Sequence, residues 1–524
     1  MNIHKYIKPA LGSLLMLIGT MACTDLEIEQ SDSIISEETG GGFEPLANPA
    51  SSLNDLYNKV GGDFATQENM YALSEVTTDE LLVPTRGTDW GDNGVWRQLH
   101  THTWTPAHLF IKNAWNNLNQ NVFRATEIIK SNPDAGVLAE AKFLRAFNMF
   151  FIMDYFGSVP FREVEEGPEI NPKVFTRSEA YDMIEKDLQE ALTGLPNGSP
   201  GNANTGTASK AAANFLLAKL YINAHIYKGT GTADNADMQK VIDAVDAIGA
   251  QGFAIESSGY FKIFEPTDNT ETIFYLNSDI GARIWNSMHY SQNSPDNTGG
   301  GWNGFTTLAE FYDSFQGDPN NNNMGNGQEE RRGYVPNATT ANDQNLGIGY
   351  GFLIGQQYNE DGTKLKNRQG GDLIFTKEVP SLVGNGEAEG IRVIKYHPYD
   401  PTDTEDHVNS FRRHQVLFRY ADAHLMKAEA MMRIGGDPTA MVNELRQSRE
   451  NTSSIGSVTE DVLLAERGRE LYIEFWRRND LIRFDKFTAP WALKEVTGDP
   501  NVNLFPIPET ALLSNPNLIQ NPGY

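Results

Sequence analysis

A single cysteine, Cys23, is present among the 524 residues of this chain. One thiol cannot form an intramolecular disulfide, so the folded state must be held together by the packing of a hydrophobic core. A chain of this length can bury a large core, because the fraction of surface that is buried rises with chain size. The 8 Trp, 19 Tyr and 27 Phe residues supply apolar surface for this core and leave aromatic side chains for a ligand face.

The position of Cys23 indicates a lipid attachment point. Lys5 and Lys8 give a basic start, the stretch from Ala10 to Ile18 is almost wholly apolar, and small or uncharged residues lead into the cysteine. This pattern predicts a lipoprotein signal peptide over residues 1–22 and lipidation of Cys23. The apolar stretch is too short to span a bilayer, but two or more acyl chains hold a protein stably on a membrane. Residues 23–44 are rich in Ser, Glu and Gly and are expected to form a flexible tether.

The charge of the chain argues against a nucleic-acid partner. The formal net charge is -27, from 69 acidic and 42 basic residues. Such a field repels polyanions at long range, although screening confines the effect to about 10 Å. Neutral ligands are therefore favoured.

Pairs of helices are predicted at three places in the chain. In the first pair, near residues 107–156, Leu144, Phe147, Phe151 and Tyr155 fall on one helical face, and Gly157 ends the helix. A hairpin turn is expected at residues 131–134 between about 107–130 and the second helix. Further pairs are predicted near 177–228 and 417–449, the last with residues from Leu417 onward in helical step. We expect one domain over 45–524.

Two loop-rich regions, near 84–104 and 252–408, interrupt the helical pattern. The longer region is rich in Gly, Asn, Asp and Pro, with short strands predicted at 272–276 and 391–396. Long loops inside a packed body are usually functional, so both regions are expected to form the ligand face.

Motifs of the last hundred residues resemble those of a known family. They are Phe418–Asp422, Lys427–Ala430, Glu466–Leu471, Trp476–Phe484, Leu504–Pro508 and Asn515–Tyr524. Upstream, Glu140–Ala146, Phe156–Phe161 and Ser209–Tyr221 fit the same pattern. In this order they resemble the SusD/RagB family of nutrient-uptake lipoproteins. From the residues alone, the arginine-rich turn after Trp476 is interpreted as an internal ion-pair network rather than a ligand site.

The resemblance implies a mostly α fold, in which four tetratricopeptide-type helix pairs support a loop-rich ligand face with a few short strands. It also implies a binding protein without catalysis or cofactor that delivers oligosaccharide to a SusC-like TonB-dependent transporter. The acidic run Asp25, Glu27 and Glu29 resembles the signal that sends lipoproteins to the outer face of the outer membrane. We expect a neutral glucan of the starch or laminarin kind as ligand. The alternatives are a RagB-like peptide carrier and a lipid-anchored glycoside hydrolase.

Two loops carry the side chains that a sugar site needs. Sugars present flat C–H faces ringed by hydroxyl groups, so aromatic rings beside hydrogen-bonding side chains can bind them. The resemblance to starch-binding members places Trp90, which follows Thr78–Glu80, and Trp302, which precedes Thr306–Phe315, as stacking rings. Tyr290 or Trp285 is the expected third ring, whereas Trp96 is expected to pack the loop onto the body. The polar partners predicted beside these rings are Arg86, Asp89, Asp92, Asn93 and Asn303.

Two clusters of polar residues have types or spacings that could suggest a metal site. His100, His102 and His108 lie in a predicted strand and turn without an acidic fourth ligand, and are interpreted as surface histidines. Asp318, Asn320, Asn322 and Glu329 have the spacing of a calcium loop. However, the glycine required at the sixth position is replaced by Asn323 and Pro319 intrudes, so a solvated loop without metal is expected.

Overall fold

Helices are the main regular structure of the described chain. The computed structural model describes residues 43–201, 205–292, 300–341, 347–396, 413–495 and 497–524. The predicted signal peptide, Cys23 and almost all of the predicted tether lie outside this part of the chain. The helices are α1 (Pro49–Ala65), α2 (Asn69–Glu75), α3 (Val95–Thr101), α4 (Leu109–Lys130), α5 (Ala135–Phe156), α6 (Arg177–Gly194), α7 (Lys210–Ile222), α8 (Ala224–Tyr227), α9 (Asn235–Gly249), α10 (Gly281–Ser287), α11 (Ala309–Asp313), α12 (Tyr420–Arg433), α13 (Thr439–Gln447), α14 (Glu460–Leu471), α15 (Arg477–Arg483) and α16 (Glu509–Ser514).

Helix α5 lies at the centre of the helical part. Its side chains are buried on nearly every face from Ala139 onward, which is the property of a helix packed among others. The Asp134 carboxylate accepts hydrogen bonds from the first free backbone N–H groups, and Gly157 ends the helix at φ 74°. Both limits agree with the prediction from sequence. Helices α4 and α6 pack on either side, so the predicted pair at 107–156 is confirmed.

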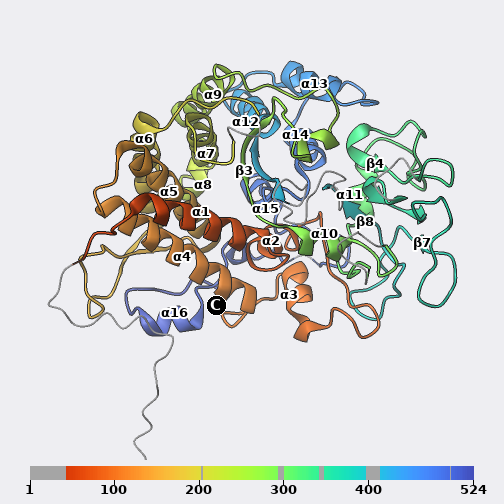
Figure 1. Cartoon of the computed structure of the whole chain (residues 1–524), viewed down its shortest axis with the longest axis horizontal. Coiled ribbons are helices and arrows are strands. Elements are labelled where there is room, and N and C mark those ends of the chain that lie inside the picture. Colours follow the sequence, from red (N-terminus) through yellow and green to blue (C-terminus); the bar gives the residue numbers. More distant parts are fainter. Residues whose placement is uncertain (1–42, 202–204, 293–299, 342–346, 397–412, 496) are drawn as a thin grey trace, which may run out of the picture. The chain divides into compact units, whose positions relative to one another are not determined.

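The remaining long helices pack on one another in chain order. In the series α4, α5, α6, α7, α9, α12 and α13, each helix contacts the next one. Figure 1 shows this helical part on one side, with β4, β7, β8, α10 and α11 among long loops on the other. Helix α9 was not among the predicted elements, although it packs against both α7 and α12. None of the helices in the described part is both long enough and apolar enough to cross a membrane.

The strands in the described ranges are short and form four small sheets. They are β1 (Val159–Phe161), β2 (Lys173–Phe175), β3 (Thr272–Leu276), β4 (Gly333–Tyr334), β5 (Tyr350–Leu353), β6 (Gly355–Gln356), β7 (Ile374–Phe375), β8 (Arg392–Ile394) and β9 (Gln415–Arg419). The pairings β1–β2, β3–β9, β4–β5–β8 and β6–β7 are all antiparallel. The strand predicted at 272–276 is confirmed, whereas the one predicted at 391–396 is limited to β8.

Two helix boundaries differ from the prediction. Leu417 belongs to strand β9 and not to the following helix, because β9 pairs with β3 and α12 begins only at Tyr420. The predicted helix through 208–227 is divided at Asn223 into α7 and α8. The Asn223 amide donates hydrogen bonds to the Lys219 carbonyl at 2.9 Å and to Asn479 Oδ1 at 3.0 Å, so this residue anchors the break to α15.

The arginine-rich turn after Trp476 is an internal ion-pair network, as predicted. Arg477 binds Asp79 at 2.6 Å, Arg478 lies 3.3 Å from Asp154, and Arg483 binds Glu429 at 2.8 Å. These partners come from three distant parts of the chain. The C-terminal segment is therefore tied to the N-terminal helices and to α12 through buried charges.

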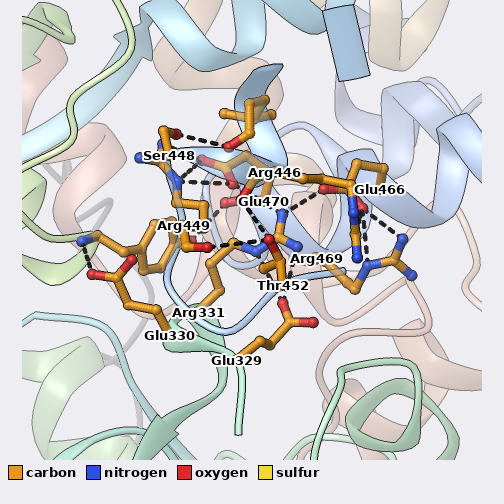
Figure 2. A network of polar contacts seen from close by, with 12 residues as sticks. Glu329, Glu330, Arg331, Arg446, Ser448, Arg449, Thr452, Glu466, Arg469 and Glu470 are labelled. Carbon is orange, nitrogen blue, oxygen red and sulfur yellow. Dashed lines mark hydrogen bonds and ion pairs between the residues drawn. The ribbon is translucent and has the colours of Figure 1, made fainter. Parts of the chain in front are cut away.

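A second buried network joins the loop-rich side to the helical side. Arg331, beside β4, lies within 3.1 Å of Glu329, Glu466 and Glu470. Figure 2 shows Arg446, Arg449 and Arg469 converging on the same two glutamates of α14. Removing one partner from such a network leaves an uncompensated charge away from water, which is strongly destabilising. The network thus fixes the loops that follow β3 onto the helical scaffold.

Candidate functional site

The region predicted as a loop at 84–104 contains helix α3 over Val95–Thr101, and its first part is held against two distant segments. Leu82 exchanges backbone hydrogen bonds with Thr306, at 2.8 and 2.9 Å. Thr85 donates its N–H to the Leu382 carbonyl at 3.0 Å and accepts from the N–H of Asn385 at 3.1 Å. Chain segments around residues 85, 304 and 385 therefore meet at one place, and side chains from all three contribute to the site.

Trp302 and Trp285 form the first part of an aromatic surface. Trp302 has 38% of its surface exposed, whereas Trp285, on α10, is half-buried. The two ring centroids are 5.6 Å apart with the planes at 61°. The Trp302 N–H donates to the Trp285 carbonyl at 2.7 Å, so the backbone fixes how the rings face each other.

Trp90 completes this surface from the other loop. Its Nε1 donates a 2.8 Å hydrogen bond to the Trp302 carbonyl. The Trp90 ring lies over Gly304, where a Cβ atom would come within 2.7 Å of Trp90 Cε2. Trp96, 2% exposed, supports the Trp90 ring from below at 6.0 Å between centroids. Trp96 is thus a packing residue, as predicted. Trp90, Trp285 and Trp302 are called the tryptophan platform below.

Tyr290 lies beside Asp89 and Arg368. Its hydroxyl donates to Asp89 Oδ2 at 2.6 Å, and the Arg368 guanidinium covers its ring at 3.8 Å from the centroid. Arg368 also binds Glu387 at 2.7 Å and lies 3.5 Å from Asp89. Burial, and then the hydrogen bond to Asp89, raise the pKa of Tyr290 to about 12, so the hydroxyl keeps its proton. One face of Tyr290 is therefore covered by a cation that the sequence did not reveal.

Arg86 and Asn303 are placed differently from the prediction. Arg86 is 2% exposed, and its guanidinium donates to the carbonyls of Gly386 and Glu389 at 3.0 and 2.7 Å. Asn303 is fully buried, and its Oδ1 accepts two hydrogen bonds from Arg392 at 2.9 and 2.6 Å. Both side chains point into the body because they bind backbone carbonyls and an arginine there. They support the loops and do not present polar groups to a ligand.

Asp92 and Asn93 are exposed at the tip of the first loop. Asp92 Oδ2 accepts a 2.9 Å hydrogen bond from Trp96 Nε1, which orients the ring beneath Trp90. Asn93 has φ 51°, a left-handed conformation that Asn tolerates better than most residues. Residues 293–299, next to Tyr290, lie outside the described chain.

The three histidines near this loop are buried rather than at the surface. His100 lies on α3, His102 follows it, and His108 precedes α4. Each Nε2 hydrogen-bonds a different backbone carbonyl, that of Ala492, Thr77 or Val95. Burial lowers the pKa of all three, that of His100 to about 4. They are packing residues, and the described part of the chain contains no group of three or more His, Cys, Asp or Glu side chains arranged for a metal ion.

The four residues with the spacing of a calcium loop do not form the solvated loop that the sequence predicted. Asn322 and Glu329 are buried, whereas Asp318 and Asn320 are exposed. Asn322 donates to the carbonyls of Arg332 and Phe352, and Glu329 binds Arg331. These four side chains are therefore divided between the interior and the surface.

Two protein-family models match the chain. One, described as the SusD family, matches residues 270–524. The other, described as starch-binding associating with outer membrane, matches residues 26–222. The chain belongs to the SusD family. Together the two matches include the motifs that suggested this family from the sequence.

Related proteins support the same assignment. The starch-binding protein SusD of Bacteroides thetaiotaomicron is 26% identical over 572 residues, covering 99% of each chain. A SusD superfamily protein from Parabacteroides distasonis has a TM-score of 0.67 at 18% identity, covering 91% of this chain and 99% of that one. A laminarin binding SusD-like protein has a TM-score of 0.65 at 20% identity, and the match covers 92% of this chain and 100% of that one. The SusD-like, mostly helical fold that the sequence predicted is thus confirmed.

Proposed function

We propose that this SusD-family protein binds oligosaccharide at the cell surface through the tryptophan platform. The observation that carries the proposal is the exposed ring of Trp302, whose backbone N–H donates to the Trp285 carbonyl and whose carbonyl accepts the Trp90 indole N–H. A ring that stays exposed while its orientation is fixed offers a C–H stacking face at little cost in side-chain entropy. Asp89, the residue before Trp90, and Arg368 lie beside Tyr290 and supply hydrogen-bond partners for hydroxyl groups.

A neutral glucan of the starch or laminarin kind is the proposed ligand. The relatives named for starch and laminarin support this choice, and so does the net charge of -27. We further propose that Cys23 is lipidated, that the protein lies on the outer face of the outer membrane, and that it delivers its ligand to a SusC-like TonB-dependent transporter. The family description that mentions the outer membrane supports the location.

The two alternatives have less support from the site. A peptide carrier needs a row of backbone-like donors and acceptors rather than exposed tryptophan rings. A hydrolase needs a carboxylic acid and a carboxylate free to act on the bond. Asp89 and Glu387, two of the acidic residues near the platform, both contact Arg368, so neither carboxylate is without a partner.

The direct test is affinity electrophoresis of the protein without residues 1–23 in gels that contain starch, laminarin, alginate or a sulfated glycan. Retardation by starch or laminarin alone is expected. Retardation only by alginate or the sulfated glycan would reject the neutral-glucan assignment, and release of reducing ends from any of the glycans would support a hydrolase. Migration unchanged in all four gels would reject the glycan function.

Gly304 offers a test of the platform geometry. In Gly304→Ala, the new Cβ would lie 1.8 Å from Asn286 Oδ1 and 2.7 Å from Trp90 Cε2, so Trp90 must move. We expect glucan affinity to fall severalfold in a titration calorimetry experiment. Gly91→Ala is the matched control, because a Cβ at Gly91, next to Trp90, meets nothing within 4 Å. Equal affinities of these two variants would contradict a fixed role for the Trp90 ring.

A further inference from the structure

A cleft on the loop-rich side is lined by three aromatic rings that the tryptophan platform does not use. It has a volume of about 450 Å³ and lies between the turn at Phe261, the short sheet β4–β5 and the loop before α14. Phe261, Tyr334 and Tyr350 line it, and each is half-buried, so each ring keeps part of its surface exposed. These residues and their surroundings are called the tyrosine cleft below. Cavities of this size are typical of small-ligand sites.

The backbone places the three rings on one wall. Tyr334 and Tyr350 are directly paired across strands β4 and β5, which brings their side chains to the same face of the sheet. Their centroids are 6.1 Å apart with the planes at 70°, whereas Phe261 lies 5.1 Å from Tyr350 with the planes at 33°. The wall therefore has two inclined aromatic faces that meet at Tyr350.

Two glycines, Gly325 and Gly327, are among the residues that line the cleft. Gly325 and Gly327 have φ of 82° and 75°, and a Cβ at either position would meet nothing within 4 Å. The positive φ angles disfavour other residues here, so no side chain at these two positions narrows the cleft. A sugar ring can therefore enter the cleft beside these glycines, where a larger side chain would exclude it.

The polar groups of the cleft suit hydroxyl groups. Glu265, Glu329, Glu330 and Glu450 line it with a single basic residue, Lys262. Glu330 is held in place, since its two oxygens accept the backbone N–H groups of Tyr260 and Glu450 at 2.6 and 3.1 Å. Carboxylates accept hydrogen bonds from sugar hydroxyls and repel anionic glycans.

We propose that the tyrosine cleft is a second binding site for neutral oligosaccharide, distinct from the tryptophan platform. The proposal rests on the proposed glycan-binding function and adds a site built from different residues on different loops. Figure 1 shows β4, the strand that carries Tyr334 of the cleft, apart from α3 and α10. A protein with two sites can hold a long polysaccharide more tightly than a short oligosaccharide wherever one chain reaches both.

The test is titration calorimetry with laminarihexaose and maltohexaose. The wild-type protein is expected to bind one of these with two molecules per chain. Phe261→Ala and Met324→Arg should each bind one molecule per chain. The first variant removes an aromatic ring of the cleft, and the second fills the cleft with a longer side chain while all three rings remain. Trp302→Ala should retain the cleft site, and the double variant Trp302→Ala, Phe261→Ala should bind at least tenfold more weakly than either single variant. A thermal melt by circular dichroism checks that each variant is folded.

The outcomes separate the two proposals. If Trp302→Ala abolishes binding while Phe261→Ala and Met324→Arg bind like the wild type, the cleft is not a glycan site but the platform function stands. If the single variants at the cleft abolish binding and Trp302→Ala does not, the cleft stands and the platform fails. A wild-type protein that binds neither hexasaccharide overturns both. A tri-arginine peptide that binds the wild type but not Phe261→Ala, with hexasaccharide binding unchanged, would assign the cleft to cationic peptides instead.

Discussion

Glu470→Gln is expected to lower the free energy of unfolding by about 3–5 kcal/mol, the usual cost of removing one partner from a buried ion pair. Glu470 is fully buried on α14, and its carboxylate lies 2.7 Å from Arg449, 2.8 Å from Arg419 and 3.1 Å from Arg331. Glutamine keeps the shape and one acceptor oxygen but not the charge. Three buried guanidinium groups would then share fewer anions in a medium of low dielectric constant.

The measurement is urea denaturation at pH 7. Asp372→Asn is the control, because Asp372 also contacts two basic residues, Lys364 and Lys366, but these pairs are solvent-exposed. Exposed pairs contribute little, so this variant should denature like the wild type. A Glu470→Gln protein as stable as the control would show that the network is not a main support of the fold.

Acid provides an independent check on the same network. The three arginines hold the pKa of Glu470 well below its ordinary value of 4.5. A carboxylate with a lowered pKa in the folded state stabilises that state above its unfolded pKa, and loses this contribution as the pH falls toward the folded pKa. The difference in stability between wild type and Glu470→Gln should therefore be constant above about pH 5.5 and shrink below pH 4.5. A difference that grows on acidification would contradict this assignment.

The helical part of the fold could be predicted where apolar spacing and end signals agree. Helix α5 had a turn signal ending at Asp134, apolar residues such as Phe147 and Phe151 in helical step and a terminal glycine, and its limits are those expected. Helix α9 carries similar signals, with a cap at Asp234 and buried Met238, Val241, Val245 and Ile248 in helical step, so it could have been found. Leu417 could not be assigned from spacing, because a short apolar run that leads directly into a helix fits the periodicity of a strand as well as that of a helix. Its pairing with β3, distant in sequence, decides for the strand.

The candidate site was less accessible to sequence reasoning. Aromatic residues among glycines indicated exposed rings, and Trp302 is indeed exposed. The direction of a polar side chain in a loop depends on backbone angles and distant carbonyls, which is why Arg86 and Asn303 proved to be buried. Arg368 had no local signal, because only the folded chain brings it onto Tyr290. The same holds for the tyrosine cleft, whose rings come from three separate segments.

Trp302→Ala is expected to weaken glucan binding at the tryptophan platform by about 2 kcal/mol, or about thirtyfold in Kd. The exposed face of Trp302 is lost, and Trp285 loses the ring that lies 5.6 Å from it. The backbone carbonyl of residue 302 remains, so Trp90 Nε1 keeps its hydrogen-bond acceptor and the loop should hold its shape. The fold should be little affected, since the deleted ring is 38% exposed.

This effect is best measured by titration calorimetry in the Phe261→Ala background, where the tyrosine cleft no longer contributes. Trp302→Phe should recover part of the affinity, because a smaller ring still offers a stacking face. Leu513→Ala removes a large side chain that is 81% exposed on α16, away from both sites, and should leave affinity unchanged. If Trp302→Ala binds as tightly as this control, stacking on Trp302 is not how the protein holds its ligand, and Tyr290, with Arg368 on one face, becomes the next ring to test.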